Sequence, residues 1–111
     1  MDIEKFVNEW IAMSNAYDIQ SYLNTYHSDA VLDDPTAGSE FKGHAGIREY
    51  FEEYFIGYQT KTYLKNIKII SETEVHLDLD FTGTFSTRKL KGTFDLVFKG
   101  GKIISAKAEL V

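Results

Sequence analysis

Residues 75–82 read VHLDLDFT, in which apolar and polar residues alternate strictly. Successive side chains of a strand point to opposite faces, so this alternation predicts a strand with one dry face. Residues 63–70 predict a preceding strand, with a turn at residues 71–73. Residues 90–99 and 102–110 predict two following strands joined by two glycines, because a tight hairpin turn needs positive φ at both positions. The C-terminal half therefore predicts an antiparallel meander.

The N-terminal part of the chain follows a helical period instead. Apolar residues at positions 3, 6, 7, 10 and 11 form one stripe behind Asp2, which is placed to cap a helix. Asp18 is placed to cap a second, short helix with apolar or aromatic residues at positions 19, 22, 23 and 26. A third helix is predicted from about Ala45 to Gly57.

The segment before the third helix has a different character. Residues 33–43 surround the only proline, Pro35, and predict an extended segment followed by a loop. Helices that precede a meander are typical of an α+β fold. We therefore expect three N-terminal helices packed on one face of a cone-shaped, curved antiparallel sheet.

Length and composition narrow the class of protein. The 111 residues predict a single domain, residues 1–111, because two smaller units would each bury too little apolar surface. Asp and Glu number 17 and Lys and Arg 12, a net charge of −5 with no basic patch of the kind that nucleic-acid binding needs. The chain has no cysteine, which excludes disulfides and cysteine nucleophiles. No run of about 18 apolar residues predicts a membrane span, so we expect a cytoplasmic protein without nucleic-acid or membrane partners.

Three segments resemble a known family: YHSDAVLDDP at residues 26–35, FKGH at residues 41–44 and IREYF at residues 47–51. Together they are similar to the cystatin-like α+β cone shared by ketosteroid isomerases, SnoaL-type polyketide cyclases and nuclear transport factor two. The resemblance covers nearly the whole chain. It implies the fold but no single activity, because the same cone carries isomerases, cyclases, dehydratases, epoxide hydrolases and non-catalytic adaptors.

The resemblance also implies roles for individual residues. In the isomerases, the Asp before the proline is the base that moves a proton beside a carbonyl, and Asp34 matches that position. The two Tyr and the protonated Asp of the family's oxyanion-hole network are matched by Trp10, Phe51 and Phe94. Asp95 lies one residue off, which is the opposite face of a strand. Because the loss of one oxyanion donor costs about 3–4 kcal/mol of transition-state stabilisation, we expect no efficient ketosteroid isomerase activity.

A pocket is implied inside the cone. The residues that the resemblance places on the pocket side are Trp10, Tyr50, Phe51, Phe94, Ala106, Ala108 and Leu110, and Tyr54 is a further candidate for ligand contact. Trp10 and Tyr50 suit ligand contact, since each joins an apolar body to one donor. Two interpretations stay open: these residues line a ligand pocket, or they are core packing. Asp34 is likewise either a base at the mouth of the cone or a turn residue, because Asp before proline is common in loops.

His76, Asp78 and Asp80 alternate along one predicted strand and are residue types that bind metals. Alternate strand positions lie about 6.5–7 Å apart, too far to converge on one ion. We interpret these residues as the polar outer face of the sheet and expect neither a metal site nor a cofactor. The resemblance implies that a homodimer forms through this sheet face.

Two functions are consistent with these residues and with the resemblance. The first is a SnoaL-like enzyme of isomerase, cyclase or hydrolase type, in which Asp34 is the general base or water activator on a small apolar molecule. The alternative is a non-catalytic ligand-binding or dimerisation module on the same scaffold. The two differ in whether a second polar group holds the charge that develops during a reaction.

Overall fold

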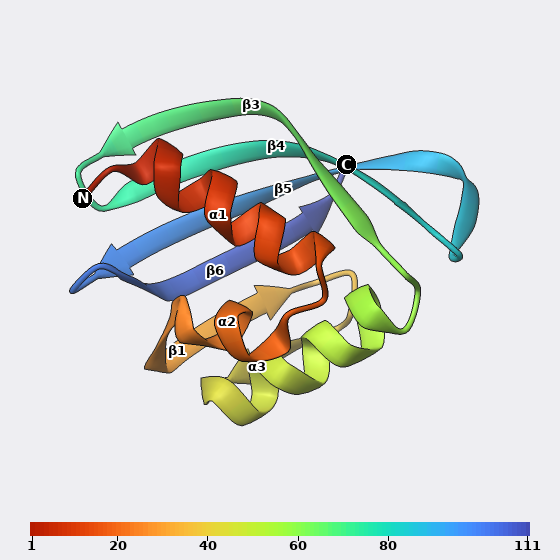
Figure 1. The fold of residues 1–111 in the computed structure, drawn as a ribbon, viewed down its shortest axis with the longest axis horizontal. Helices are drawn as coiled ribbons and strands as arrows, with labels where there is room; N and C mark the ends of the chain where they lie inside the picture. The colour runs from red at the N-terminus through yellow and green to blue at the C-terminus, as the bar shows by residue number, and fades with distance from the viewer.

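The computed structural model describes residues 1–111 as three helices and a six-stranded, curved sheet that does not close. In chain order the elements are α1 (Ile3–Asn15), α2 (Ile19–Asn24), β1 (Tyr26–Asp34), β2 (Ser39–Lys42), α3 (Gly43–Phe51), a π-helical turn (Glu52–Ile56), β3 (Lys61–Ser71), β4 (Glu74–Gly83), β5 (Ser86–Lys99) and β6 (Lys102–Leu110). The helices lie on one face of the sheet (Figure 1). The predicted α+β cone is confirmed.

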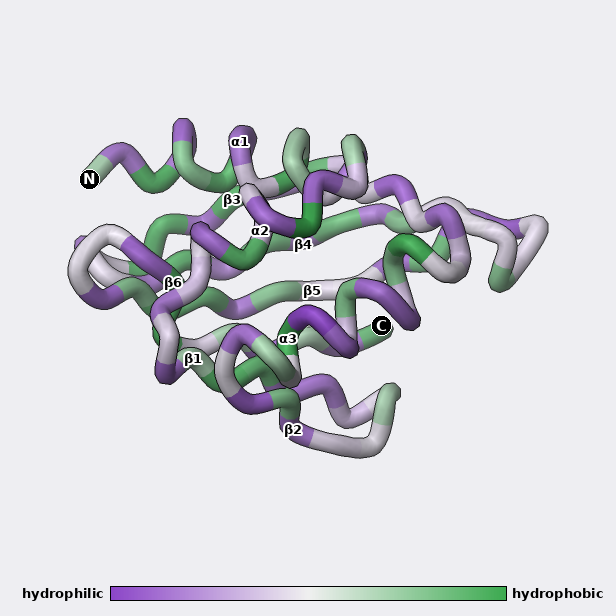
Figure 2. The backbone as a smooth tube through the Cα atoms, turned by 60° about the horizontal axis from the view of Figure 1, so that its bottom comes forward, coloured by the Kyte–Doolittle hydropathy of each residue, from purple (hydrophilic) through white to green (hydrophobic).

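The strand order is β2-β1-β6-β5-β4-β3. All neighbouring strands pair antiparallel except β1 and β6, which run parallel. The helical segment therefore returns the chain across the face of the sheet before the meander β3–β6 begins. Figure 2 shows α1 above β3 at one side of the molecule and β2 at the opposite edge. No helix is both long and apolar enough to cross a membrane.

The first two helices begin where the capping residues predict. The Asp2 carboxylate accepts a hydrogen bond from the Lys5 N–H at 3.0 Å, and Asp18 accepts one from the Ser21 N–H at 3.2 Å. Each side chain satisfies one of the unpaired N–H groups of the first turn. The second helix is shorter than its apolar spacing predicts, because Tyr26 is the first residue of β1.

The third helix begins two residues before the predicted Ala45, at Gly43, whose φ of +66° suits glycine. Its last turn, before Gly57, is a π-helix, which inserts one extra residue into the turn. Sequence spacing alone does not reveal such a turn. It matters for the site below because Tyr54 and Phe55 lie within it.

The predicted meander is confirmed, including the hairpin at Gly100 and Gly101, where φ is +59° and +78°. Two strands are not predicted from the sequence: β2 lies in the segment expected to be extended and then a loop, and β1 follows the predicted second helix without a strand assignment. The pairing of β1 with β6 shifts register between Tyr26 and Val31, so the burial of β1 does not alternate regularly. An irregular strand of this kind carries no clear period-two signal.

Candidate functional site

A cavity of about 210 Å³ lies where the helical layer meets the sheet at the end of the cone near the β4–β5 hairpin. Most of its lining is apolar or aromatic. The residues that line it are Asp34, Thr36, Ala37, Tyr50, Tyr54, Phe55, Tyr58, Thr60, Phe81, Phe85, Leu90, Thr93, Phe94, Ala108, Glu109 and Leu110. An apolar hollow with few polar groups is the usual form of a small-molecule site.

The register of the sheet explains why there is a hollow here. Asp34 follows the pair Asp33–Lys107, which places it beside Ala108, and Ala108 pairs in turn with Phe94. Neighbouring strands lie about 4.8 Å apart, so the small Ala108 leaves open space between the carboxylate and the phenyl ring. The cavity therefore results from one small residue set between two larger ones in a row across the sheet.

Asp34 occupies the wall of this cavity as a half-buried residue at the end of β1. Its Oδ1 accepts hydrogen bonds from the N–H groups of Thr36 at 2.9 Å and Ala37 at 3.3 Å. Its Oδ2 accepts one from the Tyr50 hydroxyl at 2.8 Å. The two interpretations of Asp34 are compatible, because one oxygen orders the turn after Pro35 and the other faces the Tyr50 hydroxyl.

Tyr50 lies on α3 and donates the hydrogen bond that orients that carboxylate. The residue is 3% exposed and packs against the rings of Phe41, Tyr54 and Phe55. Burial, and then the nearby Asp34 charge, raise the pKa of the Tyr50 phenol well above its usual value. Tyr50 therefore remains a protonated donor to Asp34 at any physiological pH.

The predicted pocket residues divide into two groups. Tyr50, Tyr54, Phe94, Ala108 and Leu110 line the cavity together with Asp34. By contrast, Trp10, Phe51 and Ala106 do not line it and are buried in the core. Trp10 is separated from the cavity by Phe94, whose ring it meets edge to face at 5.1 Å.

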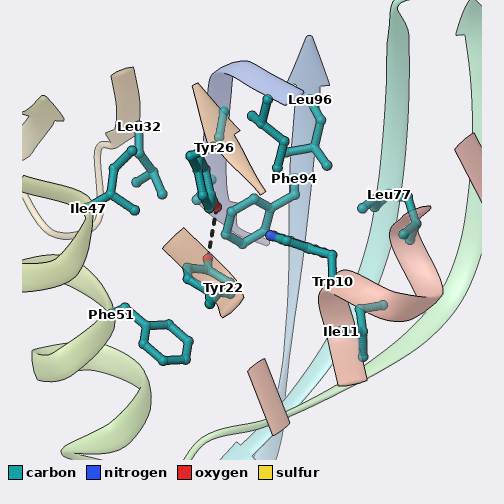
Figure 3. Close-up of a cluster of buried hydrophobic side chains, with 14 of the residues drawn as sticks. Trp10, Ile11, Tyr22, Tyr26, Leu32, Ile47, Phe51, Leu77, Phe94 and Leu96 are labelled. Carbon is teal, nitrogen blue, oxygen red and sulfur yellow. Dashed lines mark hydrogen bonds between the residues drawn. The ribbon is translucent and has the colours of Figure 1, made fainter. Parts of the chain in front are cut away.

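Behind Phe94 lies a polar cluster inside the core. The hydroxyls of Tyr22 and Tyr26 hydrogen-bond to each other at 2.8 Å, and both residues are at most 1% exposed. Figure 3 shows this pair beside Phe94 and the indole nitrogen of Trp10. The Trp10 Nε1 has no hydrogen-bond partner. Burial raises the pKa of Tyr26 to about 12, although the neighbouring Tyr22 hydroxyl and Trp10 indole act in the opposite direction.

Several residues at the mouth of the cavity are not predicted from the sequence. Phe85, at the tip of the β4–β5 hairpin, meets the ring of Tyr58 edge to face at 6.0 Å. The adjacent Thr84 donates to the Tyr58 carbonyl through both its N–H, at 2.7 Å, and its hydroxyl, at 3.1 Å. A phenylalanine within a polar turn sequence, TGTFST at residues 82–87, is the signal that could have indicated a wall residue there.

The three residues weighed as metal ligands do not converge. His76 hydrogen-bonds through Nδ1 to Asp95 at 2.6 Å and through Nε2 to Asp78 at 3.3 Å. The Asp80 carboxylate instead lies 3.3 Å from Lys89 Nζ and 3.8 Å from Lys65 Nζ. These side chains form ion pairs and hydrogen bonds across the face of the sheet that is turned away from the helices.

The chain belongs to the SnoaL-like domain family, whose model matches residues 7–106. No curated protein matches the chain. The predicted resemblance to the SnoaL-type family is therefore confirmed, and ketosteroid isomerase-like and nuclear transport factor two-like structures share its fold.

Three solved structures illustrate the similarity of shape. One is a polyketide cyclase candidate, protein SMa1630 from Sinorhizobium meliloti, with a TM-score of 0.84, 16% identity and coverage of 94% of this chain and 93% of that chain. Another is SalBIII, an epoxide hydrolase/cyclase-like enzyme in pyran ring formation in the polyether salinomycin, with a TM-score of 0.84, 18% identity and coverage of 97% and 89%. A ketosteroid isomerase candidate from Kribbella flavida DSM 17836 has a TM-score of 0.81, 11% identity and coverage of 95% and 74%. At these identities the likeness concerns the fold.

Proposed function

We propose that this protein is an enzyme of isomerase, cyclase or hydrolase type that acts on a small apolar molecule, with Asp34 as its general base. One observation carries the proposal: the Asp34 carboxylate, oriented by the Tyr50 hydroxyl at 2.8 Å, lies on the wall of an otherwise largely apolar cavity. A fixed carboxylate within reach of a bound molecule can remove a proton from a hydroxyl, a water or an acidic C–H group.

The family and the fold support this class of activity. SnoaL-like domains and the similar structures of cyclase or isomerase type share the cone in which Asp34 is held. Efficient ketosteroid isomerisation is a poor fit. It requires donors that stabilise an enolate, and the only unpaired indole N–H lies behind Phe94. Reactions whose negative charge is stabilised by the reactant itself suit the site better.

A nitrobenzisoxazole is a suitable probe because it needs only a base in an apolar cavity. The base takes the proton of the ring C–H, the C–H electron pair forms a nitrile, the N–O bond breaks, and a coloured cyanonitrophenolate is released. Nitro and nitrile groups delocalise the product charge, so no oxyanion hole is needed. We expect purified protein to catalyse this release and the Asp34→Asn variant to lose about 10²-fold or more in kcat/KM.

The adjacent aspartate provides a matched control. Asp33 pairs with Lys107 and lies on the opposite face of β1, so Asp33→Asn makes the same charge change without altering the cavity. Its rate should equal that of the wild type. Equal rates for wild type and Asp34→Asn, or no release by either, would reject the general-base role and favour the non-catalytic binding module.

We also propose that the protein forms a homodimer through the outer face of the sheet. Opposed residues on this face form a row of charges: Asp33, Lys107, Asp95, His76 and Lys68. The exposed Tyr63 lies on the same face, opposite Asp80. Light scattering after gel filtration tests the proposal: a mass of twice 12.7 kDa supports it and a monomeric mass rejects it.

A further inference from the structure

The polar end of the cavity is the Asp34 carboxylate, which already accepts hydrogen bonds from three protein groups. A carboxylate oxygen has two acceptor sites. Oδ1 of Asp34 uses both for the N–H groups of Thr36 and Ala37, whereas Oδ2 uses one for the Tyr50 hydroxyl. One acceptor site on Oδ2 therefore remains for a bound molecule. That molecule must supply the hydrogen.

Tyr54 and Thr93 also line the cavity, and each carries a hydroxyl that can donate or accept a hydrogen bond. The phenols deeper in the cone are not available to a ligand. The phenols of Tyr22 and Tyr26 bond to each other, and with Trp10 they lie outside the lining, in the core behind Phe94. Tyr58 lines the mouth but is 40% exposed, so its hydroxyl has access to water. The cavity therefore favours a ligand with a hydroxyl group, which can donate to Oδ2 of Asp34 and accept from Tyr54 or Thr93.

The cavity also limits the size of its ligand. Asp34, Ala108 and Phe94 stand on three successive strands, so about 10 Å separates the backbones of the first and the last. The volume of about 210 Å³ is below the range of about 300–1,000 Å³ typical of pockets for drug-sized ligands. Phe94 closes the far end against Trp10. This space suits one or two rings and is too short for four fused rings.

We infer that the ligand is a cyclic alcohol or phenol of one or two rings, which donates its hydroxyl to Oδ2 of Asp34 and lays its ring over Ala108 against Phe94. This inference deepens the proposed function and concerns the same site. If Asp34 is a base, the proton that it removes is then the one on the ligand hydroxyl: the O–H bond breaks, the proton passes to Oδ2, and the electron pair stays on the ligand oxygen rather than on carbon as in an enolate.

Equilibrium binding of 2-naphthol and 2-methoxynaphthalene tests the donor, because the two probes differ only in that the ether cannot donate. We expect calorimetry to show that the wild type binds 2-naphthol about ten- to a hundred-fold more tightly, as for a hydrogen bond to a charged acceptor. The preference should vanish in Asp34→Ala and persist in Asp33→Ala. Equal affinities in the wild type, or tighter binding of the acceptor 2-naphthaldehyde, would overturn the inference.

Ring number tests the size limit on the wild type alone. Phenol and 2-naphthol should bind, whereas 1-hydroxypyrene, with four rings, should not, and comparable binding of all three overturns the assignment. Phe94→Ala should admit 1-hydroxypyrene, since it opens the far wall. The two proposals can fail separately: naphthol binding without nitrobenzisoxazole turnover rejects only the base, and turnover without hydroxyl preference rejects only the ligand class.

Discussion

The Tyr50 hydroxyl lies 2.8 Å from Oδ2 of Asp34 and bridges the helical layer to the end of β1. Two backbone N–H groups hold the other carboxylate oxygen. The carboxylate thus has a fixed orientation before any ligand enters, which lowers the entropic cost of placing it against a reacting proton. Tyr50 is in this sense a positioning residue for Asp34.

Tyr50→Phe should lower kcat for nitrobenzisoxazole by about ten-fold or more, since a hydrogen bond to a charged group contributes about 1.5–3 kcal/mol. The apolar ring stays in place, so KM should change little. Initial-rate kinetics separate the two parameters. A rise in KM with unchanged kcat would instead show that Tyr50 contributes only to ligand contact.

Two alanines on the inner face of β6 offer a matched pair for the cavity. Ala108 borders the cavity, whereas Ala106 is buried at 1% exposure and does not. Ala108→Leu should fill the space, weaken 2-naphthol binding more than ten-fold and keep or raise the free energy of unfolding. Ala106→Leu overpacks the core and should cost about 1–3 kcal/mol. Calorimetric titration and urea unfolding measure both effects, and equal destabilisation by the two variants would contradict the cavity.

Alternation, capping and hairpin chemistry predict most of the fold because each is a local property. Asp2 and Asp18 act on N–H groups three residues away, and Gly100-Gly101 sets its own turn. Strand β1 escapes prediction because its register shift and its parallel pairing with β6 depend on a partner strand at the other end of the chain. The π-helical turn is not predicted either, because it depends on how the aromatic residues within it pack.

The residues of the candidate site likewise divide into those that the sequence predicts and those that depend on three-dimensional packing. The family resemblance singles out Asp34, and alternation along the strands places Phe94 and Ala108 on one face. Whether side chains fill the space over that face depends on their volumes in three dimensions. Trp10 contacts Phe94 but does not line the cavity, so it belongs to the core. The Tyr22–Tyr26 pair joins a helix to a strand, and no one-dimensional pattern indicates it.

That buried pair yields a stability prediction. Tyr22→Phe or Tyr26→Phe leaves one phenol in the core without a partner, which should cost about 1–3 kcal/mol in the free energy of unfolding. The double variant removes both partners and should be less destabilised than the sum of the single variants. Urea unfolding of the four proteins gives the coupling energy. Tyr58→Phe, at a residue that is 40% exposed, is the control and should be neutral; additive effects would argue against the hydrogen bond.

The outer face of the sheet supplies a prediction about pH. The hydrogen bond that the His76 ring donates to the Asp95 carboxylate, and then the carboxylate of Asp78, raise the pKa of His76 above its ordinary value, and partial burial opposes them. Lys68 lies opposite His76 on β3, and its positive charge disfavours the protonated form of His76. Because the folded pKa lies above the unfolded value of about 6.5, the stabilisation is complete below pH 6.5 and is lost as pH rises through the folded pKa.

The size of this effect should stay below about 1 kcal/mol, because the groups are partly exposed and solvent screens them. Nuclear magnetic resonance of the His76 ring, assigned with His76→Gln, measures its titration directly. Asp95→Asn should bring the pKa of His76 down and flatten the pH dependence of unfolding between pH 6 and 8. An unchanged pKa of His76 in that variant would show that Asp95 is only a cross-strand neighbour and does not stabilise the protonated ring.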